Sequence, residues 1–213
     1  PSDFSFNVDG GRCDDCLGEG TKKIEMQFMA DIYLECDTCK GKRFKNKVLE
    51  IRINKKNIYD ILKMTIEEAM TFFSFSKSIQ NKLTPLKDVG LGYLTLGQSS
   101  STLSGGEAQR LKLASYLGDD NKKNKNNTLF IFDEPTSGLH NKDIANFMSS
   151  ISRLVDLGNS VIIIEHNTEL IKQADWIIDL GPDGGEKGGK ICFEGTPKDL
   201  IKKRNNKTAK YLK

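Results

Sequence analysis

Four of the five cysteines occur in two pairs that could bind a metal ion. Cys13 and Cys16 form one pair, Cys36 and Cys39 form the other, and 19 residues lie between the pairs. Pairs at this spacing are typical of structural zinc sites, in which four thiolates surround one Zn²⁺. Because a four-cysteine tetrahedron leaves no open coordination position, such an ion would stabilise a small fold and take no part in catalysis. Two disulfides or four buried thiols are the alternatives.

Two acids and a histidine directly follow apolar segments. Asp133 and Glu134 come after the run 129–132, and His166 comes after the run 161–165. If both runs are parallel strands, their carboxyl ends face one ligand crevice. There Asp133 could bind Mg²⁺ and Glu134 could polarise a water molecule. A strand that ends in solvated acids is the alternative interpretation.

A predicted helix start could bind an anion. Ser104 and Glu107 have the spacing of a capping box, and Gly105 and Gly106 between them leave the backbone N–H groups bare. Unpaired N–H groups at a helix N-terminus attract phosphates. Taken alone, the segment is better explained as an ordinary helix start.

Positive charge is concentrated in two stretches, although the net charge of the chain is only +3. Residues 42–63 carry a net charge of +6, and residues 202–213 carry six basic residues and no acid. The first stretch could form a phosphate-binding face. For the second, a solvated and frayed terminus is the simpler prediction.

The segments that would position these residues differ along the chain. Short strands are predicted from two sets of alternating apolar residues: Phe4, Phe6 and Val8, and Ile24, Met26 and Phe28. Between residues 57 and 91 the spacing is helical, and Thr65 and Glu68 form a capping box, so two or three helices are predicted there. Another helix is predicted from Ser104 to about residue 117, followed by a surface loop over 119–127.

After residue 127 strands and helices alternate, which favours a parallel sheet with crossover helices. The predicted strands are 128–132, 160–164 and 176–180, and the predicted helices are 141–156 and 168–174. Thr196 as N-cap and Pro197 at the first helical position predict a short last helix. Cys192 stands alone in an apolar segment and is predicted to be inert core.

Composition limits the class of protein. Hydrophobic residues make up 37% of the chain, which is enough for a core and excludes disorder throughout. The longest aliphatic run, 161–164, is far too short to span a membrane. The N-terminus shows no secretory signal and no initiating Met. We therefore expect a soluble, cytoplasmic protein and a chain that is a piece of a longer one.

Four motifs occur in the order in which ABC ATPases have them. The run 102–110 resembles the signature motif, Asp133 and Glu134 the end of the Walker B strand, 137–140 the D-loop, and His166 the switch histidine. With the cysteine pairs and the runs 88–93, 96–98, 174–182 and 195–197, the sequence resembles the C-terminal part of the UvrA family of excinuclease ABC proteins. The resemblance covers about residues 4–200. That family provides the damage-recognition ATPase of bacterial nucleotide excision repair.

The resemblance implies an α/β fold with an ABC-ATPase-type parallel-sheet lobe, a helical signature domain and a small β-rich zinc-binding module. The implied domains are the zinc module over 1–43, the signature domain over 44–118 and the distal lobe of the ATP-binding domain over 119–213. It also implies one structural Zn²⁺, and ATP with Mg²⁺ in the complete protein. The implied partners are damaged double-stranded DNA, a second copy of the complete protein and a UvrB-type repair subunit, with no membrane.

Roles for individual residues also follow from the resemblance. Contacts to ATP or Mg²⁺ are implied for Ser104, Gly105, Gly106, Asp133 and Ser137. The first three would touch the γ-phosphate of ATP held by an opposing half. Glu134 and His166 would be catalytic. DNA contacts are implied for the basic residues beside the zinc module, namely Lys42, Arg43, Lys45 and Lys47.

A complete ATPase of this type needs a phosphate loop of the form G-x-x-x-x-G-K-[ST]. The nearest match, 184–190, has Ile191 where the hydroxyl residue should stand, and a predicted strand follows it. A glycine-rich hairpin is therefore predicted there. In the resembled family the phosphate loop lies upstream of the zinc module, so this chain alone is expected neither to hydrolyse ATP nor to bind it tightly.

Three other interpretations stay open at this point. The ATPase component of a membrane transporter shares the ABC motifs but does not ordinarily carry a four-cysteine module ahead of the signature helix. A chaperone-type binding module is suggested because the run 13–20 resembles a repeat of DnaJ zinc domains. A specialised paralogue of the repair protein would have the same motifs as the housekeeping form.

Overall fold

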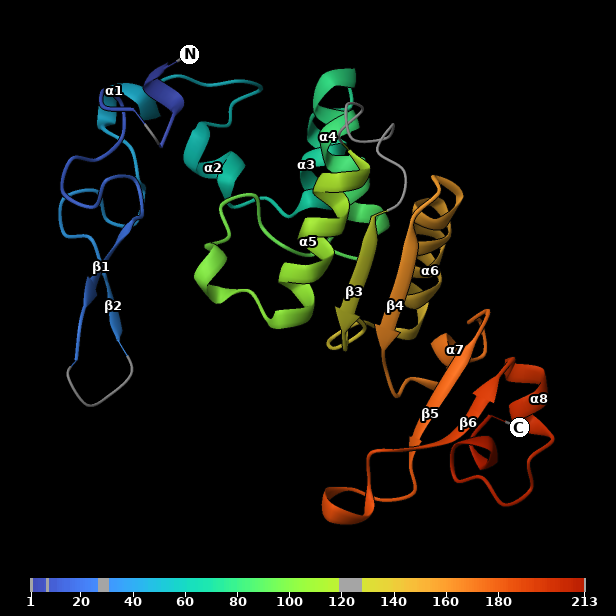
Figure 1. The fold of residues 1–213 in the computed structure, drawn as a ribbon. Coiled ribbons are helices and arrows are strands. Elements are labelled where there is room, and N and C mark those ends of the chain that lie inside the picture. Colours follow the sequence, from blue (N-terminus) through green and yellow to red (C-terminus); the bar gives the residue numbers. More distant parts are fainter. Residues whose placement is uncertain (1, 7, 27–30, 119–127, 213) are drawn as a thin grey trace. The chain divides into compact units, whose positions relative to one another are not determined.

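The computed structural model describes residues 2–6, 8–26, 31–118 and 128–212 (Figure 1). The chain divides into two compact units. The first unit comprises Pro1–Gln80 and Gly92–Leu103, and the second comprises Asn81–Leu91 and Ser104–Lys213. Within the described ranges, no helix has both the length and the apolar character needed to cross a bilayer.

The first unit begins with the cysteine-bearing segment. Strands β1 (Thr21–Ile24) and β2 (Ile32–Glu35) form an antiparallel pair, so the predicted strand near Ile24 is confirmed. Phe28 lies outside the described residues. The predicted strand at residues 4–8 is wrong, because a 3₁₀ turn, η1 (Ser2–Phe4), occupies its start. The Phe6 ring packs 5.3 Å from the Phe44 ring, so the apolar spacing there reflects packing of a turn.

The rest of the first unit contains short helices and, at Ser100–Thr102, a 3₁₀ turn, η2. The helices are α1 (Asn46–Leu49), α2 (Ile58–Leu62), α3 (Ile66–Phe72) and the start of α4 (Lys77–Asp88), whose later residues belong to the second unit. The prediction of two or three helices between residues 57 and 91 is confirmed. Thr65 caps α3 as predicted: its hydroxyl accepts from the Glu68 N–H at 3.1 Å, and its own N–H donates to the Glu68 carboxylate at 2.9 Å.

A parallel strand pair is the centre of the second unit. Strands β3 (Leu129–Asp133) and β4 (Ser160–Ile164) lie side by side with Ile131 opposite Ile162, and α6 (Asn141–Asp156) connects them, as predicted (Figure 1). Helix α6 packs on the sheet, with the Phe147 ring edge-on to the Phe132 ring at 6.2 Å. On the other sheet face Ile131 and Ile162 are exposed. The predicted loop over 119–127 lies outside the described residues.

The third predicted strand does not join this parallel pair. Strand β5 (Ile177–Gly181) pairs antiparallel with β6 (Lys190–Gly195), and the glycine-rich segment between them contains a 3₁₀ turn, η3 (Gly185–Lys187). The predicted hairpin is therefore confirmed, and a strand follows it as expected. Cys192 is exposed and is not core. The strand register slips between Asp179 and Leu180, so Cys192 has no residue paired opposite it.

The C-terminal segment is anchored, contrary to the prediction of a frayed terminus. Helices α7 (Thr168–Ile171) and α8 (Pro197–Ile201) come before this segment, and Thr196 caps α8 as predicted. The segment itself contains the 3₁₀ turn η4 (Thr208–Lys210). Leu200, Ala209 and Leu212 are buried together. Asn206 and Thr208 both donate hydrogen bonds to the Asp179 carboxylate, at 2.6 and 2.8 Å. These apolar and polar contacts hold the basic segment against the β5–β6 hairpin.

Candidate nucleotide and metal sites

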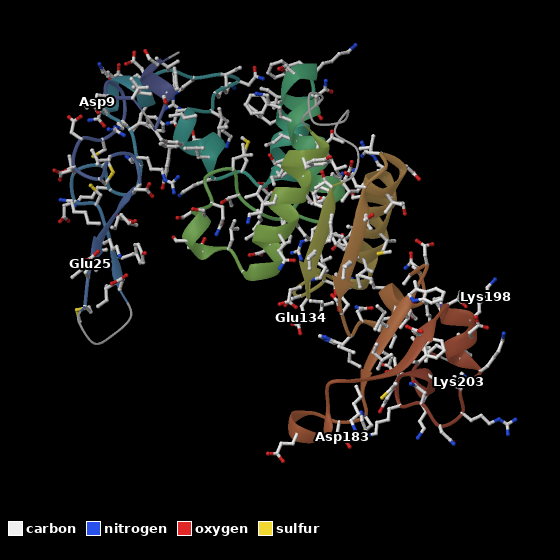
Figure 2. The ribbon with its side chains drawn as sticks, in the orientation of Figure 1. Asp9, Glu25, Glu134, Asp183, Lys198 and Lys203 are labelled. Carbon is white, nitrogen blue, oxygen red and sulfur yellow. The ribbon has the colours of Figure 1, made fainter. Side chains whose placement is uncertain are left out.

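The carboxyl ends of β3 and β4 bring two of the predicted catalytic residues together. Asp133 is the last residue of β3 and lies opposite Ile164, the last residue of β4. Glu134 and His166 follow these strands, with the Glu134 Oε1 and His166 Nδ1 atoms 3.8 Å apart. Their side chains are 59% and 82% exposed, and Figure 2 shows Glu134 at the end of β3. An acid and a histidine at this edge can both act on a bound ligand.

The backbone of Glu134 is unusual. Its φ angle is 45°, in the left-handed region that costs a residue with a side chain about 1–2 kcal/mol. Its N–H donates to the Ile164 carbonyl at 2.9 Å, and its carbonyl accepts from the Ser137 N–H at 3.1 Å. These bonds extend the sheet by one residue and then turn the chain sharply. The Glu134 side chain is thereby placed at the end of the sheet, where it is more than half exposed (Figure 2).

The predicted anion-binding segment starts helix α5 (Gly105–Leu117). The Ser104 hydroxyl accepts from the Glu107 N–H at 3.3 Å, and the Ser104 N–H donates to the Glu107 carboxylate at 2.7 Å, which confirms the capping box. A Cβ atom at Gly105 would meet no heavy atom within 4 Å. At Gly106 it would lie 3.3 Å from the Glu134 carbonyl oxygen. Gly106 thus permits close approach to the turn after β3, and Gly105 leaves the helix start open.

Two residues one turn further along α5 are additions to the predicted site. The Gln109 side-chain amide donates to the Asp133 carbonyl at 3.0 Å and accepts from the Asp133 N–H at 3.0 Å. Arg110 is fully buried and donates to the carbonyls of Pro135 and Ser137. The sequence holds one signal for Arg110: it shares the buried helix face of Gly106, Leu113 and Leu117. These bonds fix the helix start relative to the end of β3.

Glu165 is a further addition, because sequence spacing identifies it only as the end of a strand. Its carboxylate accepts from the backbone N–H and the hydroxyl of Thr136. It also accepts from the N–H groups of His166 and Asn167, at 2.9 and 3.1 Å. Burial alone would raise the pKa of Glu165, but these hydrogen bonds hold it below its ordinary value. The carboxylate is therefore ionised at neutral pH.

The four paired cysteines form one buried cluster in the first unit. Their sulfur atoms all lie within 4.8 Å of one another, with Cys13 and Cys36 at 3.9 Å and Cys16 and Cys39 at 3.6 Å. The Gly20 N–H donates to the Cys16 sulfur at 3.2 Å. Backbone N–H groups, that of Cys39 first, lower the pKa of the Cys36 thiol to about 7, and burial raises the pKa of Cys39 to about 12. The cluster could hold a metal ion, which would favour the thiolate form.

The four predicted DNA-binding cations differ in their surroundings. Lys42 and Lys47 are exposed and form no ion pair within the described part of the chain. Lys45 pairs with Asp14 at 2.8 Å. Arg43 is half-buried, lies over the Phe6 ring at 5.8 Å, and its carbonyl accepts from the Cys13 N–H. Two of the four are thus free to meet a phosphate, and two contribute to the fold of the cysteine module.

The chain is closely similar in sequence to proteins named UvrABC system protein A. It is 54% identical to that of Clostridium acetobutylicum over 210 residues, which is 99% of this chain and 22% of the relative. It is 56% identical to that of Thermus thermophilus over 200 residues, 94% of this chain and 21% of the relative. The crystal structure of UvrA2 from Deinococcus radiodurans matches with a TM-score of 0.83 and 42% identity, covering 99% of this chain and 26% of that one. No protein-family model matches the chain.

The chain matches a C-terminal part of UvrA. It spans about 22% of the length of these curated UvrA relatives. The structural match covers 99% of the chain and so includes both the second unit and the four-cysteine module, which supports the predicted α/β fold with a small metal-binding module. A transporter ATPase or a DnaJ-type module is not favoured, because the match to UvrA covers the whole chain.

Proposed function

We propose that this chain provides the C-terminal part of an ABC-type ATPase that recognises damaged double-stranded DNA in nucleotide excision repair. The observation that carries the proposal is the pairing of Glu134 and His166, 3.8 Å apart, where two parallel strands end. Ligands of such sheets bind beyond the carboxyl ends of the strands. The similarity to UvrABC system protein A over the whole chain supports DNA repair as the process.

In the proposed reaction Glu134 polarises the water that attacks the γ-phosphate of ATP. Its carboxylate is more than half exposed, so a water molecule can reach it. Asp133 would bind Mg²⁺, which neutralises charge on the transferred phosphoryl group. His166 lies beside Glu134 and would contact the same phosphate. Ser137 would contact nucleotide from the turn that Arg110 holds.

The start of α5 would bind the γ-phosphate of ATP held by an opposing half. Gly105 and Gly106 place backbone N–H groups in the first turn of a 13-residue helix that Ser104 caps, and the helix dipole attracts anions there. Since one half supplies the helix start and the other holds the phosphates, the site is complete only when two halves meet around nucleotide. ATP occupancy would thereby control the shape that the protein presents to DNA.

Zinc is the metal that best fits the four-cysteine cluster. In a tetrahedral site with Zn–S bonds of about 2.3 Å, neighbouring sulfurs lie about 3.8 Å apart. Two of the sulfur pairs lie at 3.6 and 3.9 Å, and all four sulfurs lie within 4.8 Å of one another. Cys13, Cys16, Cys36 and Cys39 would hold one structural Zn²⁺. The ion would stabilise the module next to the proposed DNA contacts.

Lys42 and Lys47 are the strongest candidates for those DNA contacts, with Arg43 and Lys45 beside them. Contacts to phosphates suit a protein that must accept lesions in any sequence. The proposed partners of the complete protein are a second copy of itself and a UvrB-type protein, in the cytoplasm.

The decisive experiment uses a chimaera in which this chain replaces the matching segment of the Clostridium acetobutylicum UvrABC system protein A. We expect the chimaera to hydrolyse ATP in a DNA-dependent manner. Glu134→Gln should abolish turnover and leave nucleotide binding intact, because the amide can still accept a hydrogen bond but cannot polarise water as a base. Full turnover by the Glu134→Gln chimaera would show that Glu134 has no catalytic role.

A further inference from the structure

A single carboxylate connects the two segments that carry Glu134 and His166. The Glu165 Oε1 atom accepts from the Thr136 N–H at 3.0 Å and from the Thr136 hydroxyl. The Oε2 atom accepts from the N–H groups of His166 and Asn167. Thr136 lies 29 positions before Glu165 and two positions after Glu134. Glu165 therefore bridges the turn after β3 and the turn after β4.

Glu165 cannot share the proposed role of Glu134, although both acids lie at the same sheet edge. Four donors point at the two oxygens of Glu165, which fills the about four acceptor sites of a carboxylate. The Glu134 carboxylate is 59% exposed and meets His166 at 3.8 Å. The Glu165 carboxylate is therefore occupied by protein donors, whereas the Glu134 carboxylate can still contact a ligand.

The bridge acts on a backbone conformation that needs support. Glu134 has a left-handed φ angle, and such conformations persist where surrounding contacts fix them. One support is the bond from the Glu134 N–H to the Ile164 carbonyl, and another is Arg110, which binds the carbonyls of Pro135 and Ser137. The Glu165 carboxylate is a third support, because it accepts hydrogen bonds from Thr136 in this turn. The same carboxylate accepts from the N–H of His166. Glu165 is therefore placed to set the separation of the pair.

We propose that Glu165 is a positioning residue for the ATPase reaction, holding Glu134 and His166 at the separation that lets both act on one nucleotide. The inference rests on the proposed function. Reacting groups must be placed to within a fraction of an ångström, and a misplacement of about 1 Å costs about a hundredfold in rate. Loss of the bridge should therefore reduce kcat much more than it changes KM for ATP.

The first test is kinetic and uses the chimaera. Glu165→Gln keeps the size of the side chain but turns an NH₂ group toward N–H donors, so kcat should fall about tenfold to a hundredfold with KM within about twofold. Thr136→Val removes the hydroxyl and should lower kcat, whereas Thr136→Ser keeps the hydroxyl and should restore it. Glu169→Gln, an exposed Glu in α7 that pairs with Lys172, is the matched control. A Glu165→Gln chimaera with the kinetics of Glu169→Gln would overturn the proposal.

The second test needs no ATPase activity and uses the isotope-labelled 213-residue chain. In Glu165→Gln the amide NMR signals of Thr136, His166 and Asn167 should all move, and in Glu169→Gln the Thr136 signal should stay in place. If His166 and Asn167 move but Thr136 does not, the bridge is absent and the proposal is overturned. A chimaera without any ATPase activity would instead contradict the proposed function, so the two failures are distinguishable.

Discussion

The side-chain amide of Gln109 and the backbone of Asp133 form two reciprocal hydrogen bonds, each 3.0 Å long, across 24 positions of the chain. Gln109 lies one turn inside the helix that Ser104 caps, and Asp133 ends strand β3. A helix start and a strand end are thereby fixed to each other by one side chain. In the proposed ATPase, Ser104 at the helix start would contact the ATP of the opposing half, whereas Asp133 would serve the ATP of its own half. The two bonds of Gln109 would couple these two nucleotide sites.

Replacing Gln109 should weaken the second unit. Gln109→Ala leaves the N–H and carbonyl of Asp133 without these partners, so the free energy of unfolding should fall by about 1–2 kcal/mol. Gln109→Glu keeps the acceptor but loses the donor and should also destabilise. Urea unfolding of the chain measures both. Gln173→Ala, which removes one exposed side-chain hydrogen bond to the Glu169 carbonyl, is the control. Equal stability of Gln109→Ala and wild type would contradict the reciprocal pair.

Metal content should depend on the paired cysteines alone. We expect about one zinc per chain by elemental analysis, lost on Cys13→Ser with Cys36→Ser, since a structural ion needs its thiolate ligands. Loss of the zinc ion, by mutation or by a chelator, should unfold the first unit. Cys192→Ser is the matched control, because Cys192 is exposed and outside the cluster. Retention of zinc by the double cysteine variant would place the ion elsewhere.

DNA binding should depend more on Lys42 and Lys47 than on Lys45. In the chimaera, Lys42→Glu with Lys47→Glu should weaken duplex binding and reduce the slope of log K against log salt by about 2, about 0.9 for each lost phosphate contact. Lys45→Glu should have a smaller effect, because Lys45 already pairs with Asp14. Fluorescence anisotropy at several salt concentrations measures the slopes. Lys172→Glu, at the residue directly after α7, is the control. An unchanged slope in the double variant would show that other residues contact the phosphates.

The stability contributed by Glu165 should depend on pH. Hydrogen bonds hold the pKa of Glu165 below its ordinary value, so its stabilising effect is complete above the pKa of the unfolded chain, about 4.3. The effect is lost as the pH falls through the lower pKa of the folded state. The difference in unfolding free energy between wild type and Glu165→Gln should be constant near neutral pH and shrink below about pH 4.3. Chemical denaturation at a series of pH values measures this difference in unfolding free energy. A difference that grew toward acid pH would show that the pKa of Glu165 is raised in the folded state.

The 213-residue chain alone should not hydrolyse ATP. Its sequence has no segment of the form G-x-x-x-x-G-K-[ST], and the nearest match ends in the hairpin that leads to β6. A phosphate-release assay on the purified chain, beside the active chimaera, measures turnover. Turnover by the isolated chain that Glu134→Gln abolishes would show that these residues bind the phosphates without such a loop.

Local elements could be read directly from the sequence. The capping boxes at Thr65 and Ser104, the last helix after Thr196, and helix α6 with its flanking strands lie where the apolar spacing and cap residues predict them. Each of these depends on hydrogen bonds or side-chain faces within a few residues. The paired spacing of the cysteines likewise identified a candidate metal site before the structure showed the sulfurs together.

Partners distant in sequence were decided only by the tertiary structure. Cys192 is exposed and lies where the β5–β6 register slips, and Lys45 is paired because Asp14 is brought beside it. The reciprocal bonds of Gln109 and the two bonds from Thr136 to Glu165 also join segments far apart along the chain. Sequence spacing determines which side chains share a helix face or alternate along a strand. It does not determine which distant N–H group meets a given carboxylate, because that depends on how the elements pack.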